Sequence, residues 1–74
     1  MDIRRQLGLN VQKMRREKGW SQEDLAFESG LHRTYVSGVE RGIRNPTILI
    51  VAKLAAALGK SAGVLLEGHH RAGK

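Results

Sequence analysis

Residues 22–41, which read QEDLAFESGLHRTYVSGVER, decide the fold of this chain. Gly30 lies near the middle of this stretch and has the backbone freedom that a sharp turn between two helices needs. Ala26 is small enough for the second helix to cross closely over the first. Apolar side chains then seat the second helix on a core: Leu31, Val36 and Val39. The stretch predicts two helices joined by a tight turn, with the opposite face of residues 32–41 left free.

The preceding segment predicts a longer amphipathic helix over about residues 3–18. Its apolar residues recur at spacings of four, four and three, which places them on one helical stripe: Ile3, Leu7, Val11 and Met14. Gly19 suits the left-handed position that ends such a helix. Ser21, followed three residues later by Asp24, resembles a capping box and therefore opens the next helix.

The segment after residue 41 predicts two further helices. Pro46 disfavours helix just before itself, and Thr47 can cap a helix over about residues 48–58. The apolar stripe of that helix is expected to comprise Ile48, Val51, Leu54, Ala55 and Leu58. Ser61 can cap a final short helix that runs through Glu67. The predicted fold class is therefore all-α, a compact bundle of five helices.

The length and composition favour one small domain without catalytic chemistry. Of the 74 residues, 41% are apolar but only one each is Trp, Tyr and Phe, so the core is expected to be aliphatic. A chain this short has little room for both a scaffold and a buried catalytic site, so we expect no enzyme. We expect one domain over residues 1–67 and a flexible tail over residues 68–74.

The charge balance points to a polyanionic partner. Thirteen Lys and Arg against seven Asp and Glu give a net charge of +6, which favours nucleic acid first and an anionic membrane second. The inward apolar stripes and capped helices favour a globular fold over a membrane-bound peptide. No stretch approaches the about 18 apolar residues that a membrane span needs, and no signal peptide begins the chain, so we expect a soluble, cytoplasmic protein.

Neither metal nor cofactor chemistry is expected. The chain has no cysteine, and His69 and His70 lie far from His32 without acidic residues at ligand spacing. No serine has the histidine and acid partners of a nucleophilic site, and no glycine-rich phosphate loop is present. We expect no catalytic residue, no metal, no cofactor and no small-molecule ligand.

The sequence resembles the phage-repressor and Cro type of helix-turn-helix, the Xre family, over about residues 7–66. The residues that carry the resemblance are Gly19-Trp20-Ser21-Gln22-Glu23-Asp24-Leu25-Ala26, Gly30-Leu31, Arg33-Thr34-Tyr35-Val36-Ser37-Gly38-Val39-Glu40-Arg41-Gly42, Asn45-Pro46-Thr47 and Leu54-Ala55-Ala56-Ala57-Leu58-Gly59. Residues 33–45 look especially like the controller proteins of restriction-modification systems, which are small dimers that bind palindromic operators. The resemblance implies a lambda-repressor-like domain that binds double-stranded DNA and regulates transcription as repressor, activator or both.

In such a domain the second helix of the motif enters the major groove of DNA. The residues expected to contact bases are Arg33, Thr34 and Arg44. The residues expected to contact the DNA backbone are Gln22, Tyr35, Ser37, Arg41 and Asn45. Two alternatives stay open, because Thr34 is an ordinary residue at a helix N-terminus and Tyr35 can equally pack its ring at the rim of the core. The family pattern also implies a structural ion pair between Arg15 and Glu40.

Extra apolar residues predict a homodimer. Beyond the expected core stripes, the last two helices carry five more apolar side chains than one domain needs to bury: Leu49, Ile50, Val64, Leu65 and Leu66. We expect them to form a twofold interface, although the final helix can instead fold back over the core. Without a ligand, control would come from protein concentration. The alternative function is the DNA-binding antitoxin, or another interaction module, of a toxin-antitoxin pair.

Overall fold

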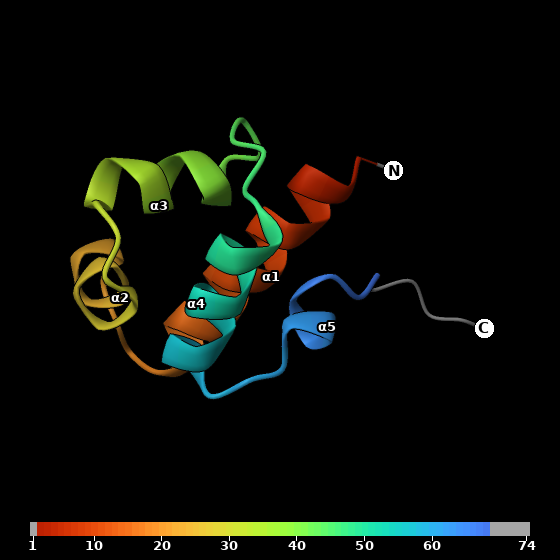
Figure 1. The fold of residues 1–74 in the computed structure, drawn as a ribbon. Coiled ribbons are helices and arrows are strands. Elements are labelled where there is room, and N and C mark those ends of the chain that lie inside the picture. Colours follow the sequence, from red (N-terminus) through yellow and green to blue (C-terminus); the bar gives the residue numbers. More distant parts are fainter. Residues whose placement is uncertain (1, 69–74) are drawn as a thin grey trace.

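The computed structural model describes residues 2–68, which form five helices with short connections (Figure 1). The helices are α1 (Ile3–Glu17), α2 (Gln22–Ser29), α3 (Arg33–Glu40), α4 (Ile48–Leu58) and α5 (Ala62–Leu65). No strand occurs in this part of the chain, and the predicted all-α class is confirmed. The tail predicted over 68–74 lies, from residue 69 onward, outside the described residues.

Side-chain caps begin α2, α4 and α5 where the sequence predicts them. Ser21 and Asp24 form a complete capping box at α2, in which the Ser21 hydroxyl accepts from the Asp24 amide at 3.0 Å and the Asp24 carboxylate accepts from the Ser21 amide at 2.9 Å. Thr47 caps α4 and Ser61 caps α5. Asp2 caps α1, a role that the sequence analysis did not assign.

The core is aliphatic and receives side chains from all five helices: Leu7, Val11, Met14, Leu25, Ala26, Val36, Val39, Val51, Leu54, Ala55, Leu58 and Leu65. Two residues expected in the core stripes lie outside it, and that prediction is wrong. Ile3 is 56% exposed and Ile48 is 86% exposed. Each is the first residue of its helix. At that end the apolar stripe extends beyond the neighbouring helices, which therefore do not cover the side chain.

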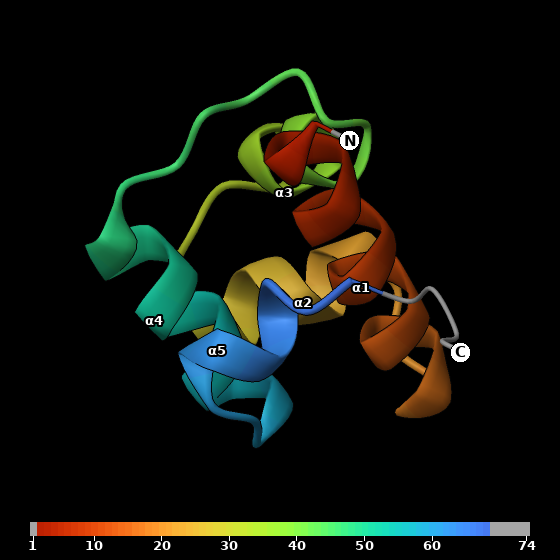
Figure 2. The same cartoon turned by 90° about the vertical axis from the view of Figure 1, so that its right-hand side faces the viewer.

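Helix α3 lies along one end of the molecule, where α1 and α2 both contact it (Figure 1). The connection over residues 41–47 arches from α3 to the start of α4 (Figure 2). α1 crosses the end of α3 so closely that a methyl group at Gly8 would lie 2.6 Å from the carbonyl oxygen of Glu40. Gly30, in the left-handed conformation with φ of 75°, makes the turn between α2 and α3. These contacts fix α3 on its inner side and leave its outer side open.

A buried polar chain holds the end of α5 against α1. The amide nitrogen of Asn10, which is fully buried, donates to the carbonyl oxygens of Leu65 at 2.7 Å and Glu67 at 2.8 Å. The amide nitrogen of Gln6 in turn donates to Asn10 Oδ1 at 3.1 Å. Neither residue is predictable from the sequence, because nothing local distinguishes a buried amide from a solvated one on a polar helix face.

Candidate nucleic-acid interface

The two faces of α3 differ sharply. Val36 and Val39 point into the core, whereas Arg33 and Thr34 are exposed at the N-terminal end of the helix. Arg33 has no ion-pair partner among residues 2–68. The guanidinium of Arg33 therefore remains available to a molecule outside the protein.

Glu40 joins α1, α2 and α3. From α1, Arg15 donates through Nε to Glu40 Oε2 at 2.7 Å and through Nη2 to Oε1 at 3.0 Å, so the ion pair implied by the family resemblance is present. Its third nitrogen, Nη1, donates to the Trp20 carbonyl at 2.8 Å. The hydrogen bonding to Glu40 raises the pKa of Arg15, while burial opposes that rise. This bidentate pair fixes the C-terminal end of α3.

Gln22, the first residue of α2, also bonds to Glu40. Its Nε2 donates to Oε1 of that carboxylate at 3.0 Å. The sequence predicts a contact of Gln22 with the DNA backbone but does not predict this bond. One N–H of the amide is used, and its second N–H and its oxygen remain for other partners.

Tyr35 of α3 and Arg44 of the following connection lie against each other. The Tyr35 ring is half-buried and packs at the rim of the core, as one of the two open readings had it. The guanidinium carbon of Arg44 lies 5.2 Å from the ring centroid, which is the geometry of a cation–π contact. The other residues expected at the DNA backbone are Ser37, half-buried on α3, Arg41, exposed at its C-terminus, and Asn45, exposed in the following connection.

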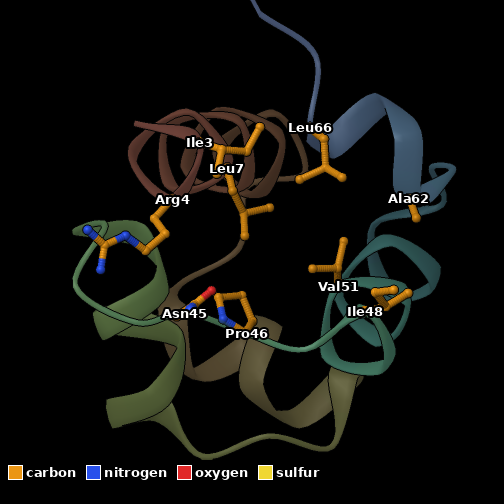
Figure 3. A pocket seen from close by; sticks show the side chains of 9 residues that line it. All are labelled: Ile3, Arg4, Leu7, Asn45, Pro46, Ile48, Val51, Ala62 and Leu66. Carbon is orange, nitrogen blue, oxygen red and sulfur yellow. The ribbon is translucent and has the colours of Figure 1, made fainter. Parts of the chain in front are cut away.

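An apolar groove opens between α1, the start of α4 and α5 (Figure 3). It has a volume of about 190 Å³, and we call it the α1–α4–α5 groove. Its apolar lining includes Ile3, Leu7, Pro46, Ile48, Val51 and Leu66. Arg4 and Asn45 also line it, so the groove begins in the same connection that carries Arg44.

Of the five residues expected at a dimer interface, two are exposed, two are half-buried and one is buried. Leu49 is 65% exposed and Leu66 is 40% exposed. Val64 and Ile50 are half-buried and pack against the core, and Ile50 lines a separate hollow beside α3. Leu65 is fully buried within the single chain, so the predicted contact with a second copy does not hold for this side chain. The short α5 turns it inward, where α4 and α1 cover it.

Two features of the described part of the chain bear on other functions. None of its helices has both the length and the apolar character to cross a membrane. Within the same residues, His, Asp and Glu side chains do not gather in threes as metal ligands would.

Comparison with known proteins places the chain in a family. The helix-turn-helix family model matches residues 11–65. The uncharacterised HTH-type transcriptional regulator y4dJ of Sinorhizobium fredii is 48% identical over 61 residues, which are 82% of this chain and 79% of that protein. The crystal structure of the restriction-modification controller protein C.AhdI from Aeromonas hydrophila gives a TM-score of 0.81 at 47% identity, over 84% of this chain and 94% of that one.

A further structure shows such a protein on DNA. The restriction-modification controller protein C.Esp1396I, crystallised as a tetramer with its natural 35 base-pair operator, gives a TM-score of 0.80 at 40% identity, over 88% of this chain and 86% of that one. The extent of these matches over a single compact fold is enough to assign the family. This chain belongs to the helix-turn-helix family, in its Xre type.

Proposed function

We propose that this chain is a sequence-specific regulator of transcription, as repressor, activator or both, and that α3 enters the major groove of double-stranded DNA. The observation that carries the proposal is the exposed Arg33, which has no ion-pair partner within residues 2–68, beside the exposed Thr34 at the N-terminal end of α3. An arginine there can donate two hydrogen bonds to guanine, and a threonine can contact a thymine methyl or an adenine edge.

The residues around α3 support binding to the phosphate backbone. Gln22 lies at the start of the neighbouring helix, where a free amide N–H can reach a phosphate. We assign further backbone contacts to Tyr35, Ser37, Arg41 and Asn45. Arg44 lies across α3 and is the third candidate for a base contact. The net charge of +6 supplies a general attraction to DNA.

We propose that two copies pair through the α1–α4–α5 groove, whose lining includes Leu66, and through the exposed Leu49, which follows Ile48 on α4. Ile3 and Ile48 join this surface, although the sequence analysis placed them in the core. Exposed apolar side chains gathered around a groove are typical of an interaction site. A twofold dimer would present two α3 helices one DNA turn, about 34 Å, apart, and so would match a palindromic operator.

The narrower proposal is that the protein is a restriction-modification controller. The similar controller C.Esp1396I is a tetramer on its operator, which supports pairing of copies and of operator sites in this chain as well. The concentration of this protein would then determine the fraction of operator that is occupied. We propose binding without catalysis, at DNA in the cytoplasm.

Selection of binding sites from random duplex DNA, repeated across a salt titration, tests the proposal. We expect a twofold-symmetric site to be recovered. Binding that ignores sequence and shows only a steep loss of affinity with salt would refute it. A toxin that copurifies with the protein would instead favour the antitoxin alternative.

A further inference from the structure

Arg44 does not extend freely from its connection but lies back across α3. Its guanidinium carbon is 5.2 Å from the centre of the Tyr35 ring. A methyl group built at Gly38 would lie 2.7 Å from Cγ of Arg44 and 3.1 Å from its Nε. The stem of Arg44 therefore rests on the backbone of α3, and its charged end rests on the tyrosine. We propose that Gly38 determines DNA specificity, because its missing side chain lets Arg44 be held in place on α3.

Gly38 is buried, and the atoms that a methyl group there would meet belong to Arg44, so this arginine covers α3 at Gly38. The position of Gly38 follows from its spacing to Thr34, which is on the side of α3 that would face DNA. Gly38 is one helical turn beyond Thr34, and residues four apart lie on the same face of a helix. An arginine that crosses the helix at Gly38 therefore joins the row begun by Thr34. The surface that contacts DNA bases is then made of two segments, α3 and the connection that follows it.

The helix itself does not require glycine at this position. Glycine is unfavourable inside a helix relative to alanine, and the described glycines with positive φ are Gly19, Gly30, Gly42 and Gly59. The three atoms nearest to a methyl group at Gly38 all belong to Arg44. At Gly8, by contrast, the methyl group would meet the backbone of α3. Alanine at position 38 would therefore displace one flexible side chain and leave the fold in place.

A held arginine binds more tightly than a free one. A long side chain loses rotamer freedom when it binds, and a side chain already fixed by its surroundings loses less. The Tyr35 ring adds a cation–π attraction that favours one position of the guanidinium. This inference rests on the proposed function, because Arg44 can discriminate bases only if this side of α3 binds DNA.

The test compares the wild type with Gly38→Ala, Arg44→Ala and the double variant, with Lys60→Ala as the control for loss of one charge. Lys60 lies beside Lys18 and Leu58, away from α3. We expect Gly38→Ala to lower affinity for the selected operator about tenfold or more, and to flatten base preference at the same symmetric positions as Arg44→Ala. The double variant should bind no worse than Arg44→Ala alone, because Gly38 acts through that arginine.

A second measurement needs no DNA. In the wild type, the Tyr35 ring current should shift the NMR signals of the Arg44 δ-protons, and in Gly38→Ala that shift should disappear. If Gly38→Ala fails to fold, the double variant should fold, because the colliding side chain is gone.

Three results overturn the inference: unchanged operator binding by Gly38→Ala, losses that multiply in the double variant, or a double variant that also fails to fold. A wild type that selects no sequence refutes the proposed function instead, and the NMR comparison then still decides whether Gly38 positions Arg44.

Discussion

Arg15 and Glu40 form a bidentate ion pair that joins the C-terminal end of α1 to the C-terminal end of α3. Glu40 is only 5% exposed, and its carboxylate accepts three hydrogen bonds from two side chains. Because both partners are largely removed from water, the pair is expected to matter most when it is broken on one side.

Replacing Arg15 by Met should lower the free energy of unfolding by about 3–5 kcal/mol, because it leaves the Glu40 carboxylate buried and unpaired. A domain of this size has a total stability of about 4–11 kcal/mol, so much of it would be lost. Urea unfolding measures the effect, and Arg16→Met, at the exposed neighbour, is the control. If the free energy of unfolding falls by less than about 1 kcal/mol, water must solvate the Glu40 carboxylate in the variant.

Replacing Arg33 by Ala should relax base preference at one symmetric pair of operator positions. Each lost bidentate contact to guanine is expected to cost about 1–3 kcal/mol of discrimination. Competition between the selected operator and single-base variants measures it. Lys60→Ala loses the same charge and should keep the preference. Equal effects of both variants would mean that Arg33 contributes only charge.

Replacing Gln22 by Ala should weaken binding to all sequences alike. Gln22 carries no charge, so the slope of log affinity against log salt should stay as it is, whereas Arg41→Ala should reduce that slope by about one. Stability should fall by only about 0.5–1.5 kcal/mol, because Glu40 keeps both bonds from Arg15. Affinity measurements at several salt concentrations separate the two variants, and a change of base preference in Gln22→Ala would contradict the assignment.

Replacing Leu49 by Glu should separate the proposed dimer, because it puts a charge on the exposed apolar surface next to the α1–α4–α5 groove. Sedimentation at micromolar concentration should show a monomer, with much weaker operator binding. Phe27→Glu is the matched control, since Phe27 is 84% exposed but lies on α2. Finding the wild type itself monomeric, with and without operator, would refute the dimer.

Replacing Asn10 by Ala should loosen α5. The carbonyl oxygens of Leu65 and Glu67 would lose their donor, at a cost of about 1–3 kcal/mol for each that stays buried without a partner. Hydrogen exchange should accelerate in residues 62–67 more than in α3. Uniform acceleration across the chain would indicate global destabilisation instead.

The fold was predictable because its signals are local. A few neighbouring residues are enough to identify the capping box of Ser21 and Asp24, the turn at Gly30 and the apolar stripe of α4. The stripes failed at Ile3 and Ile48, because periodicity says which way a side chain points and not whether a neighbour extends far enough to cover it. Leu65 has a different cause, because α5 has only four residues and is too short for a pattern to show which of its side chains turn inward.

The site was predictable only in part. The free face of α3 follows from its buried face, so Arg33 and Thr34 could be identified from the sequence as candidate contacts. The bond between Gln22 and Glu40, and the position of Arg44 over Gly38, arise between segments that meet only in the folded chain. In the sequence, Gly38 stands within the block that carries the family resemblance, and nothing local indicates that it accommodates Arg44.

Asn45 and Pro46 line the α1–α4–α5 groove, and Arg44 directly before them lies over α3. One short connection thus touches both the surface proposed for pairing and the surface proposed for reading DNA. An amino-acid exchange that tunes assembly would therefore also shift operator choice, and the two traits would evolve together. Grafting α3 alone onto a relative would transfer only part of its operator preference, and the graft should extend through residue 46.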